Sequence, residues 1–431
     1  MFTARRAFAT VGGSMLGFAV GATTIAFCEE QQQPSLLKSH VSGSLPPRTG
    51  TQAPVTPALL KPALLFPLDV DEDDFDSVIK DEETTGSVSK NLYIPASEHS
   101  AFTIFSGNAN ERLANEVAML LGMQLGRVKM DRFTDGEVNI QVLDNVRGKD
   151  CFVIQSLSNP VNESVMDLLL MTSCLRRASA KQITAVIPYF PYTRARTQTS
   201  SDKPFVAAAD LAKMLTVAGV DRVVLVDVHS KQVQGFFGLT PADDLDVSGV
   251  AAEYFNYKKL RNPVIVSPDH DGVQRATRFR DLLLQNGTYD DVHLAIVVDQ
   301  RRDKTQTAFN LQDFDLVGEV TGRDCIIRDD IGETGQRIVQ AAQKLKEQGA
   351  NRVFAYITHP LFTSKAIDLL EEEHGLEEVV CLNTVPLRKV SSKIRQLSVG
   401  WLLAESVRRI HENKSLSVLF ADKIQYPPVV K

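Results

Sequence analysis

Residues 324–337 read DCIIRDDIGETGQR, a short apolar run that ends in a pair of acids and a glycine-containing turn. The run holds Ile326 and Ile327 and is typical of a buried strand. Asp329 and Asp330 stand at its end, and the apolar spacing after Gly335 predicts a helix. Polar residues that follow a strand end mark the edge where open α/β sheets bind their ligands.

The same alternation of apolar runs and helical spacing continues along the chain from Phe102. Strand-like runs occupy 102–107, 150–156, 182–190, 222–230, 262–269, 294–299, 324–330, 352–360 and 378–386. Helical spacing predicts helices over 110–122, 162–178, 335–349 and in the run that ends at Leu284. The fold class predicted is α/β, with mainly parallel sheets flanked by helices.

Two pairs of similar runs within the sequence predict two domains of similar build. The runs TIFSG (103–107) and VIVSP (264–268) each open a unit, and TAVIPYFPYT resembles FAYITHPLFT at a similar offset of about 160 to 170 residues. We therefore expect two tandem α/β domains, 99–246 and 247–431, with the boundary near Asp246.

Composition excludes some classes of function. The formal net charge of the 431 residues is −6, so the chain has no overall basic field and we expect no nucleic-acid partner. The five cysteines are scattered without a Cys-x-x-Cys pair, which argues against a zinc site or a disulfide framework.

The N-terminal part has a different composition. Residues 1–28 contain no acid but include Arg5 and Arg6, as in a mitochondrial presequence. The apolar run 11–28 is at the short limit for a membrane span, so it is a removable signal, a sorting segment or an inner-membrane anchor; a secretory signal and a cytoplasmic protein are the alternatives. Residues 29–98 lack a sustained period and include an acidic block, which predicts a disordered linker.

Two strand ends place acids and a histidine where a cation or a phosphate can bind. In VLVDVHS, Asp227 and His229 share one face of a strand terminus. This pair suits a divalent metal or a phosphate-bearing ligand, but a histidine there is often only a hydrogen-bonding residue. In VSPDHDG, Asp269 and Asp271 are candidates to hold magnesium, or to cap the next helix.

Three loops carry further candidates. DRFTDGEVN places Phe133 beside Asp135 and Glu137, which suits a stacked purine and equally an ordinary turn. The loop 188–204 holds Arg194 and Arg196, which can grip phosphates or simply decorate a surface loop. The loop 297–307 holds its cations in a pattern typical of loops that close over a reaction, namely Arg301, Arg302 and Lys304.

The turn DDIGETG is the strongest single signal. Acids at a strand end can hold ribose hydroxyls, and Thr334–Gly335 can offer amide hydrogens to a phosphate at a helix N-terminus. The alternative is a capped helix start, with Glu333 and Thr334 as ordinary first-turn residues.

Taken together, these motifs resemble the ribose-phosphate diphosphokinase family, also called phosphoribosyl pyrophosphate (PRPP) synthetases, from about Phe102 to Phe420. The matches include IFSGNAN, RFTDGEVNIQVLDNVRGKD, VIPYFPYTRAR, DVHSKQVQGFFG, VSPDHDG, ITHPLF and QLSVGWLLAESVRRIHENKSLSVLF. The resemblance implies two phosphoribosyltransferase-type domains, in dimers that build hexamers. It also implies transfer of the β,γ-diphosphoryl group of Mg²⁺-ATP to ribose 5-phosphate, giving AMP and PRPP for nucleotide biosynthesis.

The resemblance also assigns roles to residues. Phe133, Asp135, Glu137 and Arg194 match positions that bind ATP. His229 and Asp269 match metal positions, with Asp227 beside them, and Arg302 matches the arginine of the catalytic loop. The positions expected to bind ribose 5-phosphate are Asp329, Asp330, Glu333, Thr334, Gly335, Gln336 and Arg337.

The sequence departs from the family pattern in the same loops. The family's loop lysine is Gln300 here, and the loss of one such contact lowers a rate by roughly 10²–10³ if it behaves like an oxyanion-hole donor. The phosphate loop of the family ends in Gly-Thr, whereas this chain has Gln336–Arg337. Ala195 and Gly238 replace a glutamine and an acid; Arg337 and Lys304 are the residues that can restore charge.

Three functions remain open at this stage. The first is an active, divergent enzyme that makes PRPP and AMP. The second is a catalytically impaired member that associates with an active paralogue and regulates it. The third is a phosphoribosyltransferase, which the long collinear match makes the weakest of the three.

Overall fold

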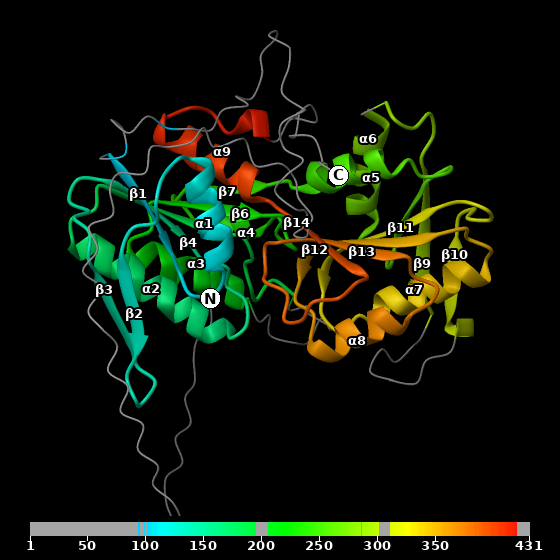
Figure 1. Ribbon diagram of the computed structural model, residues 1–431, viewed down its shortest axis with the longest axis horizontal. Helices are drawn as coiled ribbons and strands as arrows, with labels where there is room; N and C mark the ends of the chain where they lie inside the picture. Colours follow the sequence, from blue (N-terminus) through cyan, green and yellow to red (C-terminus); the bar gives the residue numbers. More distant parts are fainter. Residues whose placement is uncertain are drawn as a thin grey trace, which may run out of the picture. The chain divides into compact units, whose positions relative to one another are not determined.

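The computed structural model describes residues 94, 99, 101–194, 206–285, 287–300 and 311–419 (Figure 1). The predicted targeting segment 1–28 lies outside these residues, as does nearly all of the predicted linker 29–98. No helix within the described ranges has the length and apolar character needed to cross a membrane.

The first sheet has five parallel strands in the order β1-β4-β5-β6-β7. Their bounds are Phe102–Ser106 (β1), Asp150–Ile154 (β4), Gln182–Ile187 (β5), Arg222–Val226 (β6) and Ala242–Leu245 (β7). The first four strands confirm the sequence prediction, whereas β7 was not predicted. The helices along this part of the chain are α1 (Glu111–Leu120), α2 (Val161–Arg177), α3 (Ala207–Ala218) and α4 (Val233–Phe236).

The second sheet has seven strands in the order β10-β9-β8-β11-β12-β13-β14. All neighbouring pairs are parallel except β9 with β10, which is the antiparallel edge. The bounds are Val264–Ser267 (β8), His293–Asp299 (β9), Phe314–Val317 (β10), Cys325–Gly332 (β11), Val353–Pro360 (β12), Glu378–Leu382 (β13) and Ile394–Leu397 (β14). The helices of this part are α5 (Ser248–Lys258), α6 (Val273–Gln285), α7 (Gln336–Glu347), α8 (Ser364–Glu372) and α9 (Gly400–His411), with short 3₁₀ turns at Leu311–Asp313 and Ser417–Leu419.

The stretch 324–337 forms the central strand–turn–helix unit that its sequence predicts. β11 lies between β8 and β12 in the second sheet, and Cys325, Ile326 and Ile327 are buried because helices cover both faces of a parallel sheet. Gly335 precedes α7 with φ +73°, a conformation that favours glycine, and so allows the chain to turn sharply into the helix.

An antiparallel hairpin forms a separate two-stranded sheet. It consists of β2 (Val128–Arg132) and β3 (Val138–Val142). Arg132 anchors it to α2, since its Nη2 lies 3.2 Å from Asp167 Oδ1 and 3.1 Å from Glu163 Oε2. The sequence prediction missed both strands, because their side chains are half-buried or exposed and carry no apolar run.

The last helix of the chain packs against the first helix. Residues of α1 and α9 share one apolar cluster, in which Val117 and Leu403 are fully buried. The His411 ring of α9 lies 4.4 Å from the ring of Phe102 on β1, measured between centroids. The predicted boundary at Asp246 lies between β7 and α5. Helix α9 follows this boundary in the sequence but packs against α1, which precedes it.

Candidate active site at the carboxyl end of β11

Several strand ends meet around the turn between β11 and α7. Asp329 and Asp330 stand near the end of β11, while His229 follows β6. A cavity of about 130 Å³ opens here. Its lining consists of Arg194, His229, Asp329, Asp330, Ile331, Gly332, Glu333, Thr334, Gly335, Arg337 and Ile338.

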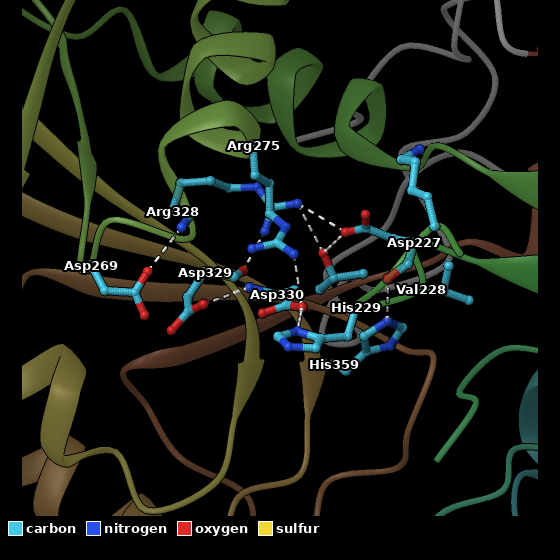
Figure 2. Close-up of polar contacts among 12 residues, drawn as sticks. Asp227, Val228, His229, Asp269, Arg275, Arg328, Asp329, Asp330 and His359 are labelled. Atoms are coloured by element: carbon cyan, nitrogen blue, oxygen red, sulfur yellow. Dashed lines mark hydrogen bonds and ion pairs between the residues drawn. The ribbon is translucent and has the colours of Figure 1, made fainter. Parts of the chain in front are cut away.

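Asp330 is a buried carboxylate that contacts a histidine and an arginine. Its Oδ2 lies 2.6 Å from Nδ1 of His229 and 2.9 Å from Nη2 of Arg275, and Figure 2 shows both side chains directed toward it. Burial acts to raise the pKa of Asp330. The His229 hydrogen bond and the Arg275 charge outweigh burial and hold that pKa below its usual range, so Asp330 is ionised at neutral pH.

Asp329 is the neighbour with the opposite shift. Its Oδ1 accepts a hydrogen bond of 3.0 Å from the backbone N–H of Asp330. Burial, followed by the negative charge of Asp330, raises the pKa of Asp329 to about 7. Two adjacent acids with opposite shifts can donate and accept hydrogen bonds side by side, which suits a pair of sugar hydroxyls.

Arg337 contacts two acids that come from different strands. Its Nη1 lies 2.9 Å from Oδ2 of Asp269, which follows β8, and 3.4 Å from Oδ2 of Asp329 on β11. The same Asp269 accepts a 2.8 Å hydrogen bond from the backbone N–H of Gly272 through Oδ1. The cation that replaces the family's loop threonine therefore bridges carboxylates in this structure.

Arg328 is a site residue that the sequence analysis missed. Its guanidinium is fully buried, with Nη2 2.9 Å from Asp227 Oδ2 (Figure 2) and 3.1 Å from Thr358 Oγ1. The guanidinium carbon lies 4.2 Å from the ring centre of Tyr356. Burial acts to raise the pKa of Asp227, but the charges of Arg328 and Arg275 and the Thr358 hydrogen bond together outweigh burial and lower that pKa. The available signal was one arginine between the apolar start of β11 and its acid pair.

The other side of Asp227 is held by a buried histidine. Nε2 of His359 lies 3.1 Å from the backbone oxygen of Asp227, and Nδ1 lies 3.0 Å from Thr384 Oγ1. Burial lowers the pKa of His359, so it is neutral and serves as a structural hydrogen-bonding residue. Asp227 has φ +39°, an uncommon conformation that this network holds in place.

The predicted metal ligands do not form a ligand set as they are arranged. Asp227 is paired with Arg328, His229 with Asp330, and Asp269 with Arg337. No group of three or more histidine, cysteine or acidic side chains in the described ranges could hold a metal ion. Each predicted ligand already has a side-chain partner in this arrangement, and its assignment as a metal ligand stays a prediction.

The predicted ATP and catalytic residues are divided among three places. Arg194 lies in the cavity, where its Nη1 is 2.5 Å from Oε2 of Glu333. Gln300, at the end of β9, is exposed and donates a hydrogen bond to Asp315 of β10. Arg302, together with Lys304 and Ala195, lies outside the described residues.

The predicted adenine contacts lie at the tip of the β2–β3 hairpin. The backbone N–H groups of Phe133 and Gly136 donate 2.9 Å bonds to Glu137 O and Phe133 O, and Gly136 has φ +94°. This confirms that TDGE forms a turn. Phe133 is 55% exposed, Asp135 and Glu137 are exposed as well, and none of the three lines the cavity, so their role in binding ATP stays a prediction.

The fold and the cavity define a class of α/β protein whose candidate ligand site lies at the turn between a parallel strand and the following helix. Comparison with known proteins makes this more specific. The family model described as "N-terminal domain of ribose phosphate pyrophosphokinase" matches residues 102–219, and the one described as "Phosphoribosyl synthetase-associated domain" matches residues 297–421.

Curated relatives match nearly end to end. The chain is 44% identical over 322 residues to a ribose-phosphate pyrophosphokinase of Shewanella oneidensis, covering 74% of this chain and 98% of the relative. A ribose-phosphate pyrophosphokinase of Ralstonia nicotianae is 43% identical, again with 74% and 98% covered. The crystal structure of phosphoribosylpyrophosphate synthetase from Mycobacterium smegmatis superimposes with a TM-score of 0.65 at 33% identity, covering 73% and 99%. The chain belongs to the ribose-phosphate pyrophosphokinase family.

Proposed function

We propose that this protein transfers the β,γ-diphosphoryl group of ATP to the anomeric hydroxyl of ribose 5-phosphate, which yields PRPP and AMP. The observation that carries the proposal is the cavity at the β11–α7 turn, which combines a buried acid pair with the N-terminus of a helix. Membership of the family over nearly the whole length of its curated relatives supports the same activity.

The side chains in the cavity divide into a sugar end and a phosphate end. Asp329 and Asp330 would hold ribose hydroxyls, because both residues line the cavity. The backbone of Thr334 and Gly335 would receive the 5-phosphate at the start of α7, where free amide groups and the helix dipole favour an anion. Arg194, released from Glu333, would contact the phosphates of ATP.

The chemistry needs positive charge around the diphosphoryl group as it moves. The bond between the α–β bridging oxygen and the β-phosphorus breaks, a bond from the sugar oxygen to that phosphorus forms, and the hydroxyl proton is lost. Arg302 is the expected cation, and Gln300 is the position where the family's lysine is missing. Catalysis of phosphoryl transfer rests mainly on positioning and electrostatic stabilisation, so these two positions should govern the rate.

The magnesium cofactor is inferred from the family resemblance. Magnesium is usually bound by one or two carboxylates together with substrate phosphates, and it would arrive here with ATP. Arginines already pair with Asp227, Asp269 and Asp330, so an ion could bind these acids only after such a pair has opened.

The test is AMP release by the purified full chain in the presence of ATP, Mg²⁺ and ribose 5-phosphate. We expect measurable AMP, and we expect Gln300→Lys to raise the rate by roughly 10²–10³ if Gln300 marks a lost transition-state contact. Gln348→Lys adds the same charge at an exposed position after α7, and should leave the rate unchanged.

Two outcomes would contradict the proposal. Absence of AMP above background from both the natural protein and Gln300→Lys would exclude an active enzyme. AMP that forms only when an active paralogue is added would favour the impaired, regulatory subunit.

The remaining proposals concern location and assembly. We propose a mitochondrial protein from the acid-free, arginine-bearing start at Arg5 and Arg6, attached to a membrane if residues 11–28 are retained. N-terminal sequencing of the native protein checks processing, and an intact Met1 would rule it out. We further propose a dimer-based homo-oligomer, up to a hexamer, or a hetero-oligomer with a paralogue, which light scattering of the purified protein would measure.

A further inference from the structure

Arg337 stands between two acids at the mouth of the cavity. Its Nη1 lies 2.9 Å from Asp269 Oδ2 and 3.4 Å from Asp329 Oδ2. We propose that Arg337 is a resident counter-cation for Asp269 and Asp329, which excludes a divalent cation until a phosphate-bearing ligand draws the guanidinium away. The inference rests on the proposed function for the identity of that ligand, a sugar phosphate.

The neighbouring acids carry the same kind of partner. Arg275 lies 2.9 Å from Asp330, and Arg328 lies 2.9 Å from Asp227. Those two guanidinium groups are largely or fully buried, with exposed fractions of 19% and 0% for their side chains, whereas the Arg337 side chain is 57% exposed. Arg337 is therefore the partner of these acids that can move without disrupting the interior.

A divalent ion and Arg337 compete for the same oxygens. Magnesium requires oxygen ligands at about 2.0–2.1 Å in near-octahedral geometry, so it cannot share Asp269 and Asp329 with a guanidinium that lies between them. Binding of the ion would require the two ion pairs to break, and a cation left beside the metal would repel it. The affinity of the natural protein for a free divalent ion should consequently be weak.

The position of Arg337 also links this competition to phosphate. Arg337 is the second residue of α7, and the turn Glu333–Gly335 that precedes the helix lines the same cavity. A phosphate bound at this helix start would attract the guanidinium and free the two acids. Phosphate and divalent ion should then increase each other's affinity, because coupling between two binding sites is reciprocal.

The experiment is a titration of the full-length protein with Mn²⁺, followed by the loss of the free-ion signal in electron paramagnetic resonance. Arg337→Gln should bind Mn²⁺ about tenfold more tightly than the natural protein, a change that corresponds to about 1.4 kcal/mol. Arg337→Lys keeps the charge and should stay close to the natural protein. Ribose 5-phosphate should tighten Mn²⁺ binding by the natural protein but not by Arg337→Gln.

Arg127→Gln is the matched control. It removes one exposed guanidinium that is paired with Asp144 at 2.8 Å near the β2–β3 hairpin, so the net charge changes equally without touching the cavity. Its Mn²⁺ affinity should equal that of the natural protein. Thermal unfolding of each variant would verify that it is folded.

Several results would overturn the inference. An unchanged or weaker Mn²⁺ affinity in Arg337→Gln, the absence of saturable binding by that variant, or an equal gain in Arg127→Gln would each do so. The readout does not depend on turnover. AMP release with no Mn²⁺ effect would defeat this inference alone, whereas a clear Mn²⁺ effect without AMP release would defeat only the proposed activity.

Discussion

The β11–α7 turn and the tip of the β2–β3 hairpin both carry acids that the sequence marks for ligand binding, yet these acids differ in burial and in the groups that contact them. At the β11–α7 turn, Asp329 and Asp330 are only 6% and 3% exposed, and guanidinium groups lie against them. At the hairpin tip, Asp135 and Glu137 are exposed, and the described contacts of Asp135 are those of an ordinary turn.

This difference separates two kinds of site. Buried charges require partners, so the acids of the turn contribute to the stability of the fold as well as to any ligand binding. Exposed side chains of a hairpin tip contribute little to stability, so they can be changed to suit a ligand without destabilising the fold. Substitutions at the turn should therefore change stability strongly, and those at the hairpin should change binding alone.

The largest effect is expected at Arg328. Arg328→Met removes the buried partner of Asp227 and leaves that carboxylate uncompensated, which should lower the free energy of unfolding by roughly 3–5 kcal/mol. Urea denaturation followed by circular dichroism measures the change. Arg127→Met breaks an exposed ion pair beside the hairpin and should cost about 1 kcal/mol or less. Equal losses in the two variants would refute the comparison.

A smaller, pH-dependent effect is expected at Asp244 on β7, beside the Asp227 network. Burial, with the nearby charge of Asp227, raises the pKa of Asp244 to about 6. A raised folded pKa means that its contribution to stability is complete below about pH 4 and is lost as the pH rises through about 6.

Asp244→Asn cannot ionise and keeps an oxygen to accept the 3.0 Å bond from the Val228 N–H. Relative to the natural protein it should gain about 2 kcal/mol between pH 4 and pH 8, as measured by urea denaturation at each pH. Parallel stability curves for the two proteins would show that Asp244 does not titrate in this way.

The smallest effect on stability is expected at Phe133. Its side chain is 55% exposed, so Phe133→Ala should change the free energy of unfolding by about 0.5 kcal/mol or less. If the ring stacks on adenine, the same change should weaken ATP binding about tenfold, since base stacking is worth about 1–3 kcal/mol. Isothermal titration calorimetry measures the affinity, and Leu143→Ala, which removes a half-exposed side chain just after β3, is the control. Unchanged ATP affinity in Phe133→Ala would remove this residue from the site.

The sequence predicted the parallel core well because buried strands and amphipathic helices each have a characteristic spacing of apolar residues that can be recognised in a sequence. The predicted unit at 324–337 is β11 followed by α7, and the other predicted strands also formed. The strands that were missed, β2, β3, β7, β10 and β14, are short; β2 and β3 contain no buried residue, and the other three mix buried with half-exposed or exposed residues. Such patterns resemble loops, so local periodicity cannot reveal them.

The site was predictable only as far as it follows the chain locally. The acids and Gly335 were predicted because strand ends and helix starts mark them, and Arg194 because it lies in a polar loop and matches a family position. The pairing of Arg337 with Asp269 joins residues far apart in sequence through a long flexible side chain, and Arg328 meets Asp227 across the two sheets. Neither contact has a local signature, and the charge that Arg337 was expected to offer a phosphate is engaged by acids.

The packing of α9 has a consequence for how this chain can be divided. By sequence α9 belongs to the second half, but its apolar face completes the core around α1, and His411 packs on Phe102. Asn383 adds to the connection, because its side chain donates to Glu116 at 3.1 Å and its backbone oxygen accepts from Asn110 at 2.8 Å. A fragment that ends at Asp246 would expose this surface to water, so we expect the first half not to fold on its own. Gene fragments split there would need to reassemble as complementing halves, and a loosened connection would allow two chains to exchange their last helices.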